Sequence, residues 1–434
     1  MEHKNFNNLD QDFYTFTLKN GLKVYLVPYK NQNNYYAILG CKYGSGDIEF
    51  KVDDKEIKTP LGTAHFLEHK MFETESGIDP FKFFSESGVN TNASTTFNNT
   101  RYYIWGVNDI EKNLSYLLDF VYTPYFTDSN VEKEKGIIKE EILMYEDDPE
   151  WAMDDEMRKN LFYNLPIREK IAGTVESVYS ITKEDLYHAY NTFYNPNNMV
   201  LIIGGNFKVK EIETLIKNHK ILNSIKKIDN IKRKEYKEPT DVKEEYKVLY
   251  RNIKIPKIRY SIKINKKKFK DFSEIEQNMY LGIVMSNLFG QTSDFKETVT
   301  NERLTSGFYI EKNIFGDYFT LDITAESDKA DMFIDEIKKT IKKIIIKKDE
   351  LERIKKVWIA SEIRMIDNVE LTVDNIFSDY IMYDNIYTNR IDYIKKLNIK
   401  RLNKFIDNLD LSNQSLVMVL PIEVKDNICI KESY

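Results

Sequence analysis

The sequence predicts an α+β fold built from a duplicated unit, and three observations support this prediction. Residues 13–28 alternate between polar and apolar side chains around an Asn-Gly dipeptide, which is typical of a β-hairpin. Residues 130–145 have the apolar spacing of an amphipathic helix. A helix-then-strand pattern that starts at Ile181 returns at Leu397, 216 residues later.

The remaining elements of the first half follow from local signals. Pro60 and Gly62 suit the start of a helix, and Gly88 suits the end of one. Thr182 and Asp185 have the spacing of a capping box. The expected elements are strands at 35–41, 90–97, 100–105 and 199–204, and helices after Gly62, over 81–87 and after Thr182.

A chain of 434 residues exceeds the usual size of one domain, so two domains are expected. Residues 226–245 are almost wholly polar and are interpreted as the linker between residues 1–225 and 246–434. Residues 281–289 weakly match residues 61–69, which extends the repeat.

Composition excludes several classes of partner. Hydrophobic residues make up 42% of the chain and charged residues 30%, as in ordinary globular proteins. The net charge is -6, with Lys and Arg spread throughout, so neither nucleic acid nor an anionic membrane is the expected partner. Residues 1–6 are polar, and no apolar run is long enough to span a bilayer, which predicts a cytoplasmic protein. Cys41 and Cys429 suit a reducing compartment and cannot form a thiolate zinc site.

The candidate metal-binding and catalytic residues are concentrated in one segment, Gly62-Thr63-Ala64-His65-Phe66-Leu67-Glu68-His69. On a helix, His65 and His69 lie one turn apart on one face, with Glu68 beside them. The H-x-x-E-H order is the inverzincin pattern, in which the histidines bind zinc and the glutamate activates water. The simpler alternative is a pair of solvated or capping histidines.

A second group of acids lies on the helix over 130–145. Glu134 and Glu141 are two turns apart on the edge that also carries Ile138. A carboxylate on the half-buried side of a helix needs a partner, and a metal or a metal-binding histidine provides one. A solvated acidic helix face is the alternative interpretation.

Together these motifs resemble the M16 family of zinc metallopeptidases, and the resemblance covers nearly the whole chain. It implies two homologous halves, each a mainly antiparallel β-sheet packed with α-helices. Within the family, two-halved chains of this length are similar to the M16B branch, including bacterial subunits that process peptide precursors. The motifs are His65-Phe66-Leu67-Glu68-His69-Lys70-Met71-Phe72-Glu73, Val131 to Ile138, Gly88 to Ala93, and Gly173-Thr174-Val175-Glu176-Ser177.

The resemblance also implies residue roles. His65, His69 and Glu141 match the ligands of one zinc ion per chain, with Glu140 as the rival of Glu141. Glu68 matches the catalytic base, and Glu134 matches the acid that orients a ligand histidine. Asn92 and Ala93 match the edge strand that binds the peptide substrate.

One feature departs from the family. Its substrate-holding Arg and Tyr are spaced R-x6-Y, whereas Arg303 lies only six positions before Tyr309. The resemblance therefore implies a homodimer or a heterodimer with an M16-like subunit that supplies the pair.

The expected function is that of a zinc endopeptidase acting on short or unfolded peptides in a chamber formed with a second subunit. Two alternatives stay open: a non-catalytic M16-like binding or assembly subunit, and a metal-dependent amidase for small molecules. The ligand set also accepts manganese or cobalt.

Overall fold

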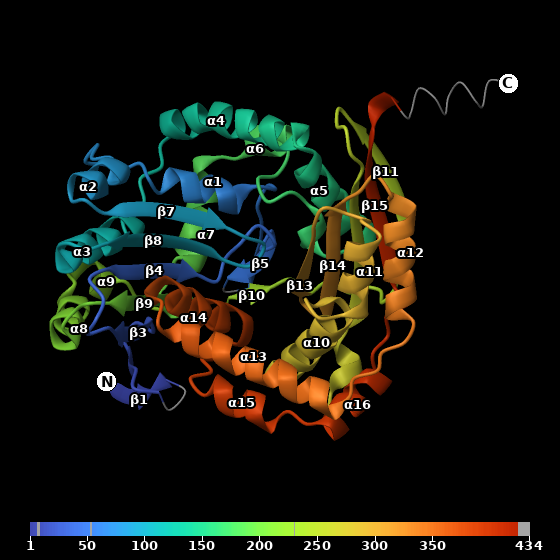
Figure 1. Cartoon of the computed structure of the whole chain (residues 1–434). Helices are drawn as coiled ribbons and strands as arrows, with labels where there is room; N and C mark the ends of the chain where they lie inside the picture. Colours follow the sequence, from blue (N-terminus) through green and yellow to red (C-terminus); the bar gives the residue numbers. More distant parts are fainter. Residues whose placement is uncertain (7–8, 53, 230, 424–434) are drawn as a thin grey trace. The chain divides into compact units, whose positions relative to one another are not determined.

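The computed structural model describes residues 1–6, 9–52, 54–229 and 231–423. These residues form two compact units, each made of segments that are distant in the sequence (Figure 1). The first unit comprises residues 1–143, 170–235 and 361–391. The second comprises residues 144–169, 236–360 and, among the described residues, 392–423.

The first unit is built on a seven-stranded sheet with the strand order β1-β2-β3-β9-β4-β8-β7. Adjacent strands are antiparallel except β3 and β9, which are parallel. The strands are β1 (Glu2–Asn5), β2 (Asp12–Thr17), β3 (Lys23–Pro28), β4 (Tyr35–Cys41), β7 (Asn90–Thr95), β8 (Thr100–Gly106) and β9 (Met199–Gly205).

Helices cover both faces of this sheet, because its central strands are apolar on both sides. Leu39 and Leu201 face a core that includes α1, α3 and α7, whereas Ile38 and Ile202 face α14. The helices are α1 (Thr63–Lys70), α2 (Pro80–Glu86), α3 (Ile110–Val121), α4 (Asp128–Asp147), α6 (Val175–Ser180), α7 (Lys183–Phe193), α8 (Val209–Asn218), α9 (Lys220–Ser224) and α14 (Val369–Tyr383).

The second unit repeats this arrangement. Its sheet has the order β11-β15-β12-β14-β13, with β11 parallel to β15 and the other pairs antiparallel. The strands are β11 (Tyr246–Arg251), β12 (Lys257–Asn265), β13 (Phe308–Phe315), β14 (Tyr318–Glu326) and β15 (Gln414–Pro421). Its helices are α5 (Pro149–Leu161), α10 (Glu274–Phe289), α11 (Asp294–Asn301), α12 (Ala330–Ile341) and α16 (Ile399–Asp407). Two further helices, α13 (Lys348–Ile366) and α15 (Arg390–Lys396), each contribute residues to both units.

The two sheets therefore share one topology, in which β3-β9-β4-β8-β7 corresponds to β11-β15-β12-β14-β13. The repeat detected in the sequence corresponds to α7 with β9 in the first unit and α16 with β15 in the second. The predicted α+β fold with mainly antiparallel sheets is confirmed.

A three-stranded sheet, β10-β5-β6, completes the first unit. It consists of β5 (Glu49–Val52), β6 (Lys55–Lys58) and β10 (Lys232–Arg233). Strand β10 and the second unit's Glu238 both come from the stretch interpreted as a linker, and Glu238 forms a buried ion pair with Lys263. The predicted division of the sequence into residues 1–225, a linker and residues 246–434 refers to homologous halves, not to these compact units. It stays a prediction.

Two further observations concern cysteine and membranes. Cys41 is a buried free thiol in β4, and Cys429 lies outside the described residues. Among the helices of the described ranges, none combines the length and the apolar character needed to cross a bilayer.

Candidate active site

Helix α1 carries the H-x-x-E-H motif and is anchored by its apolar face. Phe66 and Leu67 are fully buried in the core, so the opposite face presents His65, Glu68 and His69. The centroids of the two imidazole rings are 4.6 Å apart, as expected for residues one helical turn apart.

The start of α1 is fixed by a close approach between two backbone segments. Gly62 is the N-cap of the helix and has φ of +86°, a conformation that favours glycine. A Cβ atom on Gly62 would lie 2.4 Å from the carbonyl oxygen of Ala172. Gly173 faces Leu61 in the same way and begins the Gly-x-x-Glu segment singled out in the sequence. This segment therefore packs against the start of the motif helix.

Helix α4 brings two acids to the motif. Its buried residues Val131, Glu134, Ile138 and Ile142 form one face against the core, which sets the rotation of the helix. Glu134 and Glu141 consequently point toward α1. Glu140 points elsewhere, because its side chain is 73% exposed and lies 3.4 Å from Lys139.

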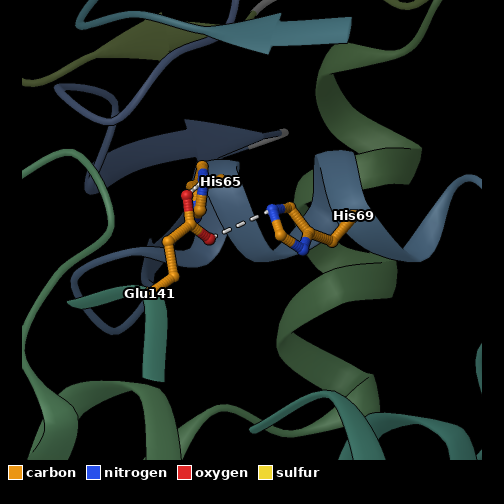
Figure 2. Close-up of side chains that lie close together, drawn as sticks. All are labelled: His65, His69 and Glu141. Carbon is orange, nitrogen blue, oxygen red and sulfur yellow. Dashed lines mark ion pairs between the residues drawn. The ribbon is translucent and has the colours of Figure 1, made fainter. Parts of the chain in front are cut away.

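His65, His69 and Glu141 lie together (Figure 2). Nε2 of His65 is 3.5 Å from Oε1 of Glu141, and Nε2 of His69 is 3.5 Å from Oε2. These separations are longer than good hydrogen bonds. Two ligand atoms of a tetrahedral zinc ion, each about 2.1 Å from the metal, are roughly 3.4 Å apart. The donor set and its spacing therefore fit a zinc ion.

Glu134 contacts the far side of the His69 ring. Its Oε1 lies 3.1 Å from Nδ1 of His69, which leaves Nε2 directed at Glu141. Burial lowers the pKa of His69, but the hydrogen bond with Glu134 and the charge of Glu141 outweigh it, so the pKa is raised overall. Burial raises the pKa of Glu134, but its bond with His69 and the charge of Lys70 lower it overall.

The two histidines differ in their supporting contacts. His69 has Glu134, whereas the buried Nδ1 of His65 has no hydrogen-bond partner among the residues that the structure describes. Of these two rings, that of His69 has a carboxylate hydrogen-bonded to its Nδ1 atom in the described structure.

Two contacts of the motif were missed by the sequence reasoning. Thr95 donates a hydrogen bond of 2.6 Å from its hydroxyl to Oε2 of Glu68. Lys70 is fully buried and contacts Glu134. Lys70 lies four residues after Phe66 and three after Leu67, so its place on the buried face could have been read from the helical period. Thr95 gives no local signal, since its contact joins a strand to a helix.

Asn92 and Ala93 lie on β7, one of the two edge strands of the first sheet. Asn92 is exposed, and its Oδ1 accepts a 2.8 Å hydrogen bond from the backbone N–H of Ala93. Strand β7 ends at Thr95 rather than at residue 97, because the Thr96 N–H bonds to the Asn99 carbonyl in a turn.

Comparisons with known proteins show the family of this chain. A family profile described as insulinase (peptidase family M16) matches residues 54–175, which contain every predicted site residue. A profile described as the peptidase M16 inactive domain matches residues 180–357. YmfH of Bacillus subtilis, named an uncharacterized zinc protease, is 38% identical over 324 residues, which cover 74% of this chain and 73% of YmfH. The chain belongs to peptidase family M16.

Solved structures share this fold. A chain from Alicyclobacillus acidocaldarius, described as an M16-like peptidase, is 31% identical and superimposes with a TM-score of 0.88. The match includes 95% of the residues of this chain and 99% of those of the Alicyclobacillus chain. A protease from Helicobacter pylori is 21% identical with a TM-score of 0.79 and supports the fold alone. It covers 94% of this chain and 99% of its own.

Among the residues of the second unit that the structure describes, no equivalent metal group is found. All five histidines of the sequence, His3, His65, His69, His188 and His219, belong to the first unit. In α10, which the sequence repeat aligns with α1, the positions of His65, Glu68 and His69 are taken by Met285, Leu288 and Phe289. Leu288 and Phe289 are buried. At these positions α10 therefore contributes apolar side chains to a core, whereas α1 has the polar side chains of its motif.

Proposed function

We propose that this M16 chain is a zinc-dependent endopeptidase that hydrolyses short or unfolded peptides. The observation that carries the proposal is the convergence of two Nε2 atoms on the Glu141 carboxylate at 3.5 Å, with Glu68 on the same helix face. Membership of the M16 family and the name of the relative YmfH support it.

His65, His69 and Glu141 are the proposed ligands of one zinc ion per chain, since they form the one such group found in the described ranges. Zinc, when bound, supplies Lewis acidity that favours ionisation of water and polarises a carbonyl. Glu134 holds the His69 ring so that Nε2 carries the lone pair that faces the metal position.

Glu68 is the proposed general base. It lies one residue before His69, and its Oε2 accepts a hydrogen bond from Thr95, which fixes the orientation of the carboxylate. Glu68 takes a proton from the water that attacks the scissile carbonyl and returns the proton to the leaving amine. Both transfers use the same carboxylate, so no second acid is required.

The peptide is proposed to lie along β7 as an additional strand. An edge strand offers unpaired backbone groups, and such pairing reads an extended chain more than a particular sequence. Asn92 and Ala93 would contact the peptide backbone beside Thr95, the residue that reaches Glu68. Substrates should therefore be short or unfolded.

A second M16-like subunit is proposed to complete a chamber and to supply the substrate-holding Arg and Tyr. Tyr309 is 74% exposed, and its distance from Arg303 in the sequence departs from the family pattern. Processing of a peptide precursor and a cytoplasmic location are part of the same proposal.

The testing experiment compares wild type with Glu68→Gln on a library of unstructured peptides, alone and with a homologous subunit, while the zinc content is measured. Loss of at least about 100-fold in cleavage with zinc retained would support the role of Glu68. Stoichiometric zinc in the wild type without cleavage under either condition would favour a non-catalytic binding subunit. Hydrolysis of small amides instead of peptides would favour an amidase.

A further inference from the structure

The lysine that follows the second histidine is buried beside the metal ligands. Lys70 is the last residue of α1, and its side chain is 0% exposed. A buried ammonium group is stable only when charged or polar partners surround it. The groups that contact Lys70 therefore indicate what this buried lysine does.

Two carboxylates pair with Lys70. Its Nζ lies 2.7 Å from Glu73, one turn further along the chain, and 3.3 Å from Oε2 of Glu134. The other oxygen of Glu134, Oε1, contacts Nδ1 of His69. Glu134 is thus a bridge, with one oxygen on the lysine and the other on the histidine.

We propose that Lys70 is a positioning residue for the metal centre and acts through Glu134. The inference rests on the proposed function, in which His69 is a zinc ligand. By engaging Oε2, Lys70 fixes the rotation of the Glu134 carboxylate, so that Oε1 accepts the Nδ1–H of His69. This bond selects the tautomer whose Nε2 lone pair is directed at the metal position.

The contrast with His65 explains why this chain of contacts matters. The Nδ1 atom of His65 has no hydrogen-bond partner among the described residues. Charged side chains therefore contact the ring of His69 on the nitrogen that faces away from the metal position. Lys70 contacts Glu134, and Glu134 contacts Nδ1 of His69. Removing the ammonium group of Lys70 should loosen the ring of His69 without touching a ligand atom.

The test measures zinc affinity of the full chain by competition with a chelator. Lys70→Met should weaken zinc binding by about 10-fold or more, the range found for groups that orient metal ligands. Glu73→Gln is the matched control, because it removes the other partner of Lys70 and should leave zinc affinity unchanged. Lys70→Arg, which retains a cationic donor, should restore most of the affinity.

A double variant separates positioning from general structural support. In a Glu134→Ala background, Lys70→Met should cause no further loss of zinc affinity, because the acceptor that joins Lys70 to His69 is already removed. The imidazole nitrogen chemical shifts of His69 in the zinc-free protein should show a mixture of tautomers in Lys70→Met and one tautomer in Glu73→Gln. If Lys70→Met does not fold, Lys70→Met/Glu73→Gln removes both charges of that pair and gives the same comparison.

The outcomes distinguish this inference from the proposed function. The role of Lys70 would be overturned if Lys70→Met bound zinc with wild-type affinity, or if the losses of affinity added in the double variant. Either result would leave the proposed function standing. Failure of the wild type itself to bind zinc would overturn the proposed function.

Discussion

The hydroxyl of Thr95 donates a 2.6 Å hydrogen bond to Glu68 Oε2 and so joins the end of β7 to the motif helix. Thr95 also lies 3.3 Å from the hydroxyl of Thr100 on β8, which supports its rotamer. The strand proposed to bind the peptide and the proposed base are therefore in direct contact.

Removing this hydroxyl should slow the chemical step. Thr95→Val preserves the shape of the side chain but deletes a hydrogen bond to a charged group, worth about 1.5–3 kcal/mol. We expect kcat to fall by about 10-fold or more with little change in KM, measured on a fluorogenic peptide. Thr95→Ser keeps the hydroxyl and should retain most activity. Equal activity of the Val and Ser variants would contradict the role of Thr95.

Adjacent glutamates on α4 provide a matched pair for the metal site. Glu141 lies 3.5 Å from both histidines, whereas Glu140 is largely exposed. Glu141→Gln should lose bound zinc and peptide cleavage together, because an amide is a weaker ligand than a carboxylate. Glu140→Gln should match wild type in zinc content and rate. Retention of zinc in Glu141→Gln with loss in Glu140→Gln would reverse the assignment.

The start of α1 should be intolerant of a side chain. Gly62→Ala imposes a positive φ on alanine and places its Cβ 2.4 Å from the Ala172 carbonyl oxygen, so we expect a loss of about 2 kcal/mol or more in unfolding free energy. The control is Gly136→Ala on α4, where a Cβ meets nothing within 4 Å. That variant should gain about 0.5–1 kcal/mol from helix propensity. Chemical denaturation measures both, and equal stabilities would refute the steric argument.

Asn92 should act on substrate binding rather than on chemistry. It is exposed on the edge strand and accepts the Ala93 N–H, so Asn92→Ala removes one polar contact and loosens the strand backbone. We expect KM to rise by about 5-fold, close to one hydrogen bond of about 1 kcal/mol, with kcat and zinc content unchanged. Asn90→Ala, on the same strand, is the comparison variant. A fall in kcat at constant KM would place Asn92 in the chemical step instead.

Local periodicity accounts for what could be predicted of the fold and the site. The helical period places His65, Glu68 and His69 on one face, and it separates Glu141 from Glu140 by about 100° around the helix. The sequence pattern of α7 and β9 returns in α16 and β15, and this repeat predicted the duplication. It could be detected because both copies show a similar capping residue and similar apolar spacing. The assigned roles of these residues stay predictions until they are tested.

Other relationships exist only in the folded chain. Strand β9 inserts between β3 and β4, and α14, more than 150 residues later in the sequence, covers that sheet. Thr95 reaches Glu68, and Glu134 bridges His69 and Lys70, across elements that no local pattern relates. The sequence by itself determined which residues share a helix face, since that depends on backbone geometry over a few residues. Tertiary structure decided which faces meet, because burial of apolar surface and pairing of buried charges are satisfied only by the whole chain.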